Sequence, residues 1–422
     1  MIWIIYIFFF WSLCLLTLWL WKSSLFKKTW QEPYFAETPV LIESDDWGPG
    51  GDFHAERLEK LLAMLNQHRD SSDRPAVLTA DIVLSIPNIQ KIKTSNDGNY
   101  FRTSLESFPD IYKVMQAGMQ QGTFVPQLHG LEHLNGKAFA QLCLKNDPRI
   151  LQAKVKDNWW DWESLDSPLQ GHYVDGSTLP TTPLSKSDAQ NIITTADKTF
   201  RQLFGHPSFS SVAPCYLWND DVENEWNQCN IQFIQTAGYR CTARDKTGHY
   251  IQDPSIIRMG EKNKLGQIYL VRNVMYEPVD GKNTAKTAFE EAVIALKQAL
   301  PITISTHRYN YTRSKKEFNQ SLAGLDQLLT QIRQNLPATR FLASPELGHL
   351  IQSPASTISN PFNNSSWPKI PTLQGLAKIK AFLFRLYYRH PKLVLASYLS
   401  GLIIPAWIIC LSATNRTQGQ KP

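Results

Sequence analysis

Between about residue 40 and residue 350, short apolar runs alternate with longer amphipathic stretches, and this alternation restricts the possible folds more than any other feature. Short apolar runs indicate buried strands, and apolar residues spaced three and four apart indicate helices. The expected strands are 40–44, 76–80, 123–127, 210–213, 231–235, 267–271 and 302–305, and the expected helices are 55–66, 111–120, 137–144, 187–203, 285–299 and 317–335. Strands alternating with helices form βα units around a parallel sheet. We therefore expect an α/β protein with an irregular (β/α) barrel of seven or eight strands, with a doubly wound sheet as the alternative.

Two segments interrupt this alternation. Residues 145–182 form an aromatic, loop-rich insertion that includes "DNWWDWESLDSPLQGHYVDG". Its Trp159, Trp160 and Trp162 could stack on sugar rings, pack the insertion or rest at a membrane interface. Residues 351–377 are rich in Ser, Pro and Asn, a composition typical of a linker. We therefore expect a barrel domain over residues 22–350, containing the insertion, followed by a linker.

Uncharged apolar segments lie near both ends of the chain. Residues 1–21, "MIWIIYIFFFWSLCLLTLWLW", and residues 393–411, "LVLASYLSGLIIPAWIICL", are each about as long as a helix that crosses a bilayer. The first lacks the basic start and small-residue cleavage site of a signal peptide. Pro405 in the second is tolerable in a membrane helix. We expect a transmembrane helix at each end and a polar tail over residues 412–422.

Basic residues flank both apolar segments on the side of the central domain. They follow the first segment and precede the second over residues 378–392, where aromatic residues suggest an interfacial helix against anionic head groups. The positive-inside rule favours a cytoplasmic central domain over a periplasmic one. The formal charge of +6 is modest and lies largely in these flanks, which indicates a membrane surface as partner and argues against nucleic acid.

Polar residues follow several of the expected strands, at the edge where barrel active sites form. Asp45 and Asp46 follow the first strand, His129 and His133 follow the third, and His307 follows the last. Two adjacent carboxylates are costly to ionise unless a cation or hydrogen-bond donors compensate them. Two histidines and a carboxylate suit a divalent transition metal, zinc above all.

The segment "HGLEH" around these histidines also matches the H-x-x-E-H pattern of inverted zinc proteases. That interpretation needs a continuous helix, which Gly130 and the following Asn135-Gly136 disfavour. A zinc protease is therefore a weaker alternative.

An Asp-Asp pair, a His-x-x-x-His and a late His, in this order, resemble the motifs of the polysaccharide deacetylases and their glycoside hydrolase/deacetylase barrel relatives. The resemblance covers about residues 40–350 and implies a role for each motif residue. It implies that Asp45 is the catalytic base and His307 the catalytic acid. It also implies that Asp46, His129 and His133 hold the metal, which would compensate the paired carboxylates.

The third and fourth motifs of that family match less well. The family usually carries an Arg ahead of a Pro-Tyr-like pair, whereas "SVAPCYLWND" has Ala213 there. Pro214, Tyr216 and Trp47 are candidates for contact with substrate or with an oxyanion. For the fourth motif, the nearest segment is "GYRCTARD", which contains Arg240 and Asp245.

The expected function is that of a membrane-anchored, metal-dependent hydrolase that removes an N-acyl group from an amino sugar of a lipid-linked or envelope glycan. The missing Arg supports an alternative, a non-catalytic carbohydrate-binding barrel. Glycoside hydrolysis needs two carboxylates across a scissile bond, and the neighbouring Asp45 and Asp46 fit that poorly.

Overall fold

The computed structural model describes residues 2–35, 37–95, 97–155, 160–336, 338–352 and 373–415. It divides into two compact units. The barrel unit contains Pro39–Glu291 and Ile302–His349, and the terminal unit contains Met1–Thr38, Ala292–Pro301 and Leu350–Pro422. Most of the expected linker, Trp159 of the insertion and most of the expected tail lie outside the described residues.

The barrel unit is built on one curled sheet whose described pairings, for eight of its nine strands, are all parallel. These eight strands are β1 (Thr38–Trp47), β2 (Leu78–Ile82), β5 (Phe124–Leu128), β8 (Ser210–Ser211), β9 (Phe233–Thr236), β12 (Ile268–Val271), β13 (Val274–Met275) and β14 (Ile302–His307). The ninth, β15 (Thr339–Phe341), pairs with β1. Each expected strand is present, and the arrangement fits a (β/α) barrel.

The two outermost strands of the curled sheet are almost adjacent in the sequence. The strand order is β12-β9-β8-β5-β2-β1-β14-β13, so β12 and β13 are the outermost strands. Only Arg272 and Asn273 separate them in the chain. The Arg272 N–H donates to Thr236 on the β9 side, and the Asn273 N–H donates to Thr303 on the β14 side. The chain therefore changes pairing partner at residues 272 and 273, which link the two outermost strands of the sheet.

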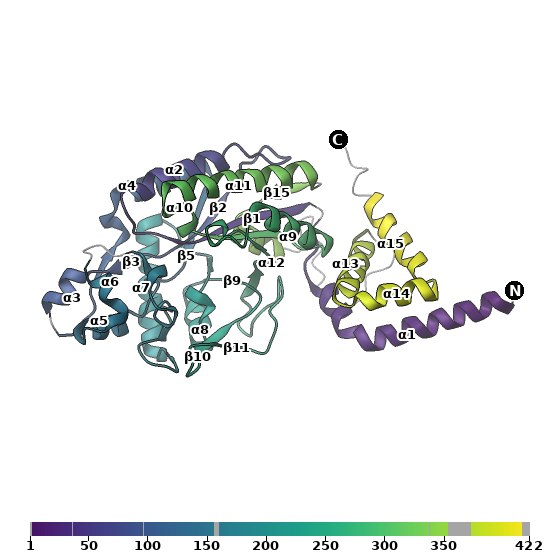
Figure 1. The fold of residues 1–422 in the computed structure, drawn as a ribbon, viewed down its shortest axis with the longest axis horizontal. Helices are drawn as coiled ribbons and strands as arrows, with labels where there is room; N and C mark the ends of the chain where they lie inside the picture. Colours follow the sequence, from purple (N-terminus) through teal and green to yellow (C-terminus); the bar gives the residue numbers. More distant parts are fainter. Residues whose placement is uncertain are drawn as a thin grey trace. The chain divides into compact units, whose positions relative to one another are not determined.

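Helices cover the outside of this sheet (Figure 1). They include all the expected ones: α2 (Phe53–Leu65), α4 (Pro109–Gln121), α5 (Gly136–Leu144), α7 (Lys186–Phe204), α9 (Ala285–Lys297) and α11 (Lys315–Asn335). Helix α2 packs against both α4 and α11. Helix α11 begins with a capping box in which Ser314 and Glu317 exchange side-chain and backbone hydrogen bonds. The amphipathic spacing thus predicted the helices correctly.

Shorter elements lie in the connections, and most of them were not expected. The helices are α3 (Ile89–Ser95), α6 (Leu151–Lys154), α8 (Asp220–Gln228), α10 (Tyr309–Thr312) and α12 (Ser344–Gln352). The small strand pairs are β3 (Ser85–Pro87) with β4 (Arg102–Ser104), β6 (Val174–Asp175) with β7 (Thr182–Pro183), and β10 (Cys241–Arg244) with β11 (Tyr250–Gln252). These elements follow β2, β5, β8, β9, β14 and β15 in the chain.

The terminal unit contains the apolar ends of the chain. Helix α1 (Ile2–Gln31) is longer than the expected span, and its residues Ile5–Gln31 are long and apolar enough to cross a membrane, with a mean hydropathy of 1.6. The second expected span, residues 393–411, is not confirmed as one straight helix. The chain there forms α14 (Pro391–Ser400) and α15 (Ile403–Asn415), which are bent by 111°. Gly401, left-handed at φ 74°, ends α14 and explains the break.

Helix α13 (Leu373–Arg389) contains most of the expected interfacial segment, but two of its basic side chains are buried. The Lys378 ammonium donates to the backbone carbonyls of Thr29 and Glu32, and Arg385 pairs with the Glu32 carboxylate at 2.5 Å. Both partners lie on or directly after α1. These two charges therefore fasten α13 to α1 and are not available to lipid head groups.

Candidate active site

Both carboxylates of the Asp45-Asp46 pair face one cavity because strand β1 is irregular at its end. Successive side chains of a regular strand point to opposite faces, so neighbours cannot share a cavity. Here the pairing of β1 with β2 shifts register between Ser44 and Trp47, and Asp46 adopts a left-handed backbone with φ 72°. Such a conformation costs a non-glycine residue about 1–3 kcal/mol and tends to occur at functional sites. Asp45 and Asp46 both line the cavity as a result.

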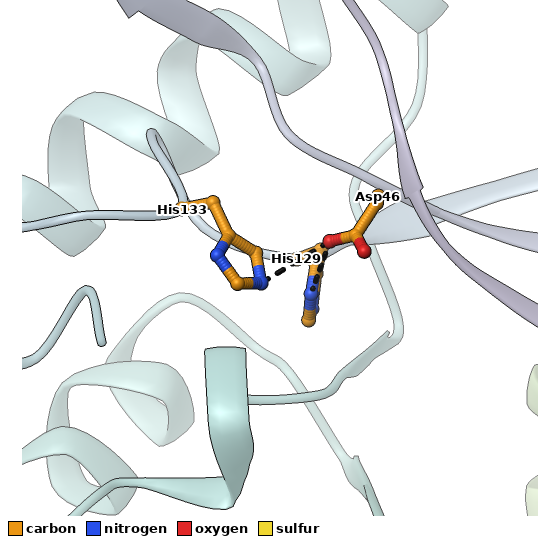
Figure 2. A group of neighbouring side chains, drawn as sticks. All are labelled: Asp46, His129 and His133. Atoms are coloured by element: carbon orange, nitrogen blue, oxygen red, sulfur yellow. Dashed lines mark ion pairs between the residues drawn. The ribbon is translucent and has the colours of Figure 1, made fainter. Parts of the chain in front are cut away.

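The two histidines converge on Asp46 from the chain that follows β5 (Figure 2). Oδ1 of Asp46 lies 3.3 Å from Nε2 of His129 and 3.1 Å from Nε2 of His133. One ligand atom from each residue lies within 4.8 Å of the others, and all three residues are buried. More than eighty residues of chain separate Asp46 from the histidines, so the barrel brings them together.

This group has the donor set and spacing of a metal site. His129 Nδ1 lies 3.0 Å from the carbonyl oxygen of Val212, which places its proton on Nδ1 and leaves the Nε2 lone pair directed at Asp46. Two acceptors that face each other in a buried site repel unless a cation lies between them. The ligand bonds of zinc, about 2.0–2.2 Å, separate tetrahedral ligands by roughly 3.3 Å, close to the spacing here. The residues therefore fit a divalent metal.

Asp45 is held by an arginine that the sequence motifs did not identify. Nη1 and Nη2 of Arg272 lie 2.7 Å from Oδ2 and Oδ1 of Asp45, a bidentate pair. Arg272 also contacts Glu43 through Nε at 2.6 Å and Asp81 through Nη2 at 3.0 Å. The guanidinium is fully buried among these carboxylates. Arg272 thus supplies the positive charge that the sequence lacks ahead of Pro214.

These contacts set the protonation of the carboxylates. Burial alone would raise the pKa of Asp45, but Arg272 and the nearby histidines hold it well below the ordinary value. Burial and the charge of Asp45 raise the pKa of Asp81 well above its ordinary value. Asp45 is therefore a carboxylate at neutral pH.

His307 lies beside Asp45 and is paired with a second unpredicted residue, Glu277. The Cα atoms of Asp45 and His307 are partners in the β1–β14 pairing, and Nε2 of His307 is 3.7 Å from Oδ2 of Asp45. Nδ1 of His307 lies 2.6 Å from Oε1 of Glu277. Burial would lower the pKa of His307, but Glu277 and Asp45 raise it to about 10. His307 is therefore a cation at neutral pH.

The cavity around these groups has a volume of about 290 Å³. The aromatic insertion supplies one wall, since Glu163 and Gln170 line it. Trp162 stacks on His133, with 5.5 Å between ring centroids and 12° between planes. Arg308 pairs with Glu163 at 3.2 Å and lies 4.2 Å from the Trp162 ring. Trp162 therefore packs against the histidine and the insertion is part of the site.

The remaining candidate residues lie in different places. Cys215 and Tyr216 line the cavity, and both have left-handed backbones, with φ of 57° and 53°. The Tyr216 hydroxyl is 3.2 Å from Nη1 of Arg272, and its N–H donates to Ala213 at 2.9 Å. Pro214 is buried beside them and is not among the lining residues. Trp47 is fully buried and donates to Ser44, so it supports the strand end and does not face the cavity.

The candidate for the fourth motif does not reach this site, and the helix that a zinc protease needs is not formed at residues 129–133, as Gly130 and Asn135-Gly136 indicated. Arg240 pairs with Asp220 and Asp253, and Asp245 accepts bonds within its own turn, so the segment offered for the fourth motif does not reach the cavity. Residues 129–133 are not helical, and Glu132 pairs with Arg102 at 2.6 Å. Glu132 is not among the residues that line the cavity, which removes the basis for a zinc protease.

The sequence contains a signal for Arg272, because this residue comes directly after the expected strand 267–271, at the edge where barrel active sites form. Glu277 was less accessible. It follows β13, a two-residue strand without an apolar run of its own.

Several solved structures resemble this chain, with low sequence identity and low TM-scores. No protein-family model and no curated protein matches the chain. A family 4 carbohydrate esterase from Streptomyces lividans, solved with acetate, is 10% identical over 74% of this chain and 95% of its own, with a TM-score of 0.34. The peptidoglycan deacetylase PdaC from Bacillus subtilis is 10% identical over 75% and 92%, with a TM-score of 0.36.

A 4-alpha-glucanotransferase from Thermococcus litoralis is 10% identical over 73% of this chain and 39% of its own, with a TM-score of 0.38. The solved structures that resemble this chain thus include both deacetylases and a glucanotransferase. The functional assignment rests on the geometry of the site.

Proposed function

We propose that this protein is a metal-dependent hydrolase of the polysaccharide deacetylase type, which removes an N-acyl group from an amino sugar. One observation carries the proposal. A metal-ligand group, Asp46 with His129 and His133, shares a cavity with a carboxylate and an imidazole that are held in opposite charge states, Asp45 and His307. Amide hydrolysis needs these parts together: an electrophile-activating ion, a base for water and an acid for the leaving amine.

Each residue around the cavity that is named below has a defined task in this scheme. A divalent ion, with zinc the best fit, would polarise the acyl carbonyl and make the attacking water more acidic. Asp45 accepts the proton of that water, and Arg272 keeps its carboxylate ionised and oriented. His307 carries a proton on Nε2, because its Nδ1–H donates a hydrogen bond to the Glu277 carboxylate, which stabilises the imidazolium. That Nε2 proton passes to the departing amine nitrogen.

Arg272 also bears on the alternative of a non-catalytic carbohydrate-binding barrel. The best support for that alternative was the missing arginine ahead of Pro214. With the bidentate contact of Arg272 on Asp45, the base has the partner that the motif lacked. This contact favours the enzyme.

The test combines metal analysis with acyl release from purified full-length protein. We expect about one equivalent of a divalent metal per chain and released acetate from a panel of N-acetylated amino-sugar oligomers. Asp45→Asn should keep the metal and lose acetate release, whereas His129→Ala should lose both. Stoichiometric metal without acyl release from any panel member, in a protein that retains its fold, would favour the binding barrel.

The proposal includes a membrane anchor and a glycan held at a membrane. Lys22, Lys27 and Lys28 lie in the last third of helix α1, after its uncharged segment, and these charges favour a barrel on the cytoplasmic side. There the substrate would be a lipid-linked precursor, whereas a periplasmic barrel would act on an exported envelope polymer. A reporter active only in the cytoplasm, inserted within residues 353–371, should give signal. Signal only from a periplasmic reporter at the same position would reverse the orientation and the substrate.

A further inference from the structure

Another cavity lies within the terminal unit and shares no lining residue with the cavity of the metal site. Its volume is about 940 Å³, compared with about 290 Å³ for the cavity that contains Asp46. Helices α1, α13, α14 and α15 form its walls, and most of the lining side chains are apolar, for example Leu15, Trp19, Phe382 and Leu402. A cavity of this size and lining is in the range of small-molecule binding sites.

The outer faces of the same helices indicate what surrounds the cavity. Large apolar side chains such as Phe9, Leu20, Leu395 and Trp407 are exposed there and do not line the cavity. Exposure of apolar surface to water costs about 25 cal/mol per Å², so an array of this kind is stable only in hydrocarbon. A cavity between helices in hydrocarbon is filled by lipid chains more readily than by water, which would lack polar partners there.

One cationic side chain interrupts the apolar lining. Nζ of Lys22 is 2.8 Å from Nε2 of His390 and 3.8 Å from the centroid of the Trp21 ring. An ammonium has three N–H donors and no acceptor, so the imidazole nitrogen accepts one bond and two donors are left for a ligand. The residues that line the cavity include no Asp or Glu, and residues 350–422 of the sequence contain none.

We propose that this cavity binds an anionic phospholipid of the bilayer, with an acyl chain against the apolar helices and the phosphate on Lys22. The complement to the cavity is a molecule with a long apolar part and one negative charge, which a phospholipid such as phosphatidylglycerol provides. The inference rests on the membrane anchor of the proposed function and is independent of the deacetylase chemistry. His390 holds the Lys22 ammonium in place by accepting its hydrogen bond.

The test uses full-length protein solubilised in detergent and equilibrated with mixed micelles that contain equal amounts of dioleoyl-phosphatidylglycerol and dioleoyl-phosphatidylcholine. Lipid retained after gel filtration is counted per chain by mass spectrometry. We expect the wild type to retain phosphatidylglycerol in preference to phosphatidylcholine. Lys22→Gln should reduce that preference roughly tenfold, the effect of one charge-assisted hydrogen bond. Ala396→Phe, which fills the cavity from α14, should reduce retention of both lipids.

Each variant has a matched control on the same helix. Lys28→Gln removes an exposed charge of α1 that does not line the cavity, and Leu395→Phe enlarges an exposed α14 side chain outside it. Both controls should retain phosphatidylglycerol like the wild type. Equal retention of the two lipids by the wild type, or equal losses in Lys28→Gln and Lys22→Gln, would overturn the proposal. A polyprenyl phosphate that displaces phosphatidylglycerol at equal concentration would also overturn it.

The anchor itself is checked separately by carbonate extraction of membranes. A protein that stays in the membrane pellet but retains no preferred lipid contradicts the cavity proposal alone. A protein that is extracted contradicts the anchor. Acetate release and metal content, measured on the same samples, report on the barrel site and not on this cavity.

Discussion

The two sides of the barrel cavity solve the problem of buried charge differently. On the histidine side, Oδ1 of Asp46 lies 3.3 Å from Nε2 of His129 and 3.1 Å from Nε2 of His133, and the lone pair of His129 Nε2 faces the carboxylate. On the ion-pair side, made of Asp45 and His307 with Arg272 and Glu277, each charged group has a partner of opposite charge within the chain. The first side is electrostatically complete only with a cation, and the second is complete without one.

This difference separates two kinds of failure. Loss of a metal should affect the histidine side and leave the protonation of Asp45 and His307 governed by their own partners. Loss of a partner on the ion-pair side should alter proton transfer and stability while the metal stays. The following predictions test whether the two sides can be separated in this way.

The largest effect is expected from replacing the two neighbouring aspartates one at a time. Asp45→Asn removes the base and should lower kcat by roughly 10²–10⁴, the usual contribution of general base catalysis, with metal content unchanged. Asp46→Asn should instead lower metal content, and activity should return in part at high added metal. Metal analysis and steady-state acetate release on both variants measure this. Equal metal loss in both would show that the two sides are not separable.

Replacing Arg272 should destabilise the barrel. Arg272→Met leaves Glu43, Asp45 and Asp81 buried without their counter-charge, and breaking a buried ion pair from one side typically costs about 3–5 kcal/mol. Urea unfolding measures the loss. Arg240→Met, which removes a half-buried arginine that also pairs with carboxylates, is the matched control and should cost much less. Similar losses of unfolding free energy in the two variants would mean that the buried ion pairs of Arg272 stabilise the protein no more than the half-buried pairs of Arg240.

The pH dependence of activity should show the effect of Glu277 on the pKa of His307. The acid His307 must be protonated, and its pKa of about 10 lies above the ordinary value of about 6.5, so activity should persist through neutral pH and fall as pH approaches 10. For the same reason, the stability that this pair contributes is fully present below about pH 6.5 and is lost as pH rises through 10. In Glu277→Gln the alkaline fall of kcat should move towards neutral pH.

A pH–rate profile of wild type and Glu277→Gln, with metal content measured at each pH, separates this shift from metal loss. Glu277→Asp serves as the control that retains the negative charge. An alkaline limb that stays in place in Glu277→Gln would mean that another group is the titrating acid.

The smallest effect is expected for Tyr216→Phe. The change removes one hydrogen bond to Arg272, of the order of 0.5–1.5 kcal/mol, and should lower activity by roughly tenfold at most. Metal content and the position of the alkaline limb should not change. A loss as large as that of Asp45→Asn would instead give the Tyr216 hydroxyl a direct part in the reaction.

The histidine side could be predicted from the sequence, and the ion-pair side could not be predicted in full. Asp46, His129 and His133 each follow an apolar run, and parallel strands bring their carboxyl ends to one edge. Arg272 also follows an apolar run, but no motif of the sequence marks it, and Glu277 follows the two-residue strand β13, which no apolar run indicates. Only three-dimensional pairing shows that these two residues lie beside Asp45 and His307.

The fold shows the same division. The seven expected strands and six expected helices depend on local periodicity, and all are present. The break between α14 and α15 depends on Gly401, whose left-handed conformation ends a helix that composition alone would continue. Hydropathy averages over such a residue, which is why a single straight span was expected at residues 393–411.

The change of partner at Arg272 and Asn273 has a consequence for the order of folding. The strands from β1 to β9 follow one another in both chain and sheet, so they can assemble progressively, whereas β14 must reach back to β1 over a separation of more than 250 residues. Contacts of such long sequence separation form late because closing a long loop costs conformational entropy before the contacts stabilise the fold. We therefore expect Asp45 to remain solvated until β14 pairs with β1, and the reactive cavity to form in that late step. Pulsed hydrogen exchange should protect the amide of Asn273, which bonds to Thr303 of β14, after those of β2 and β5, and earlier protection would contradict this order.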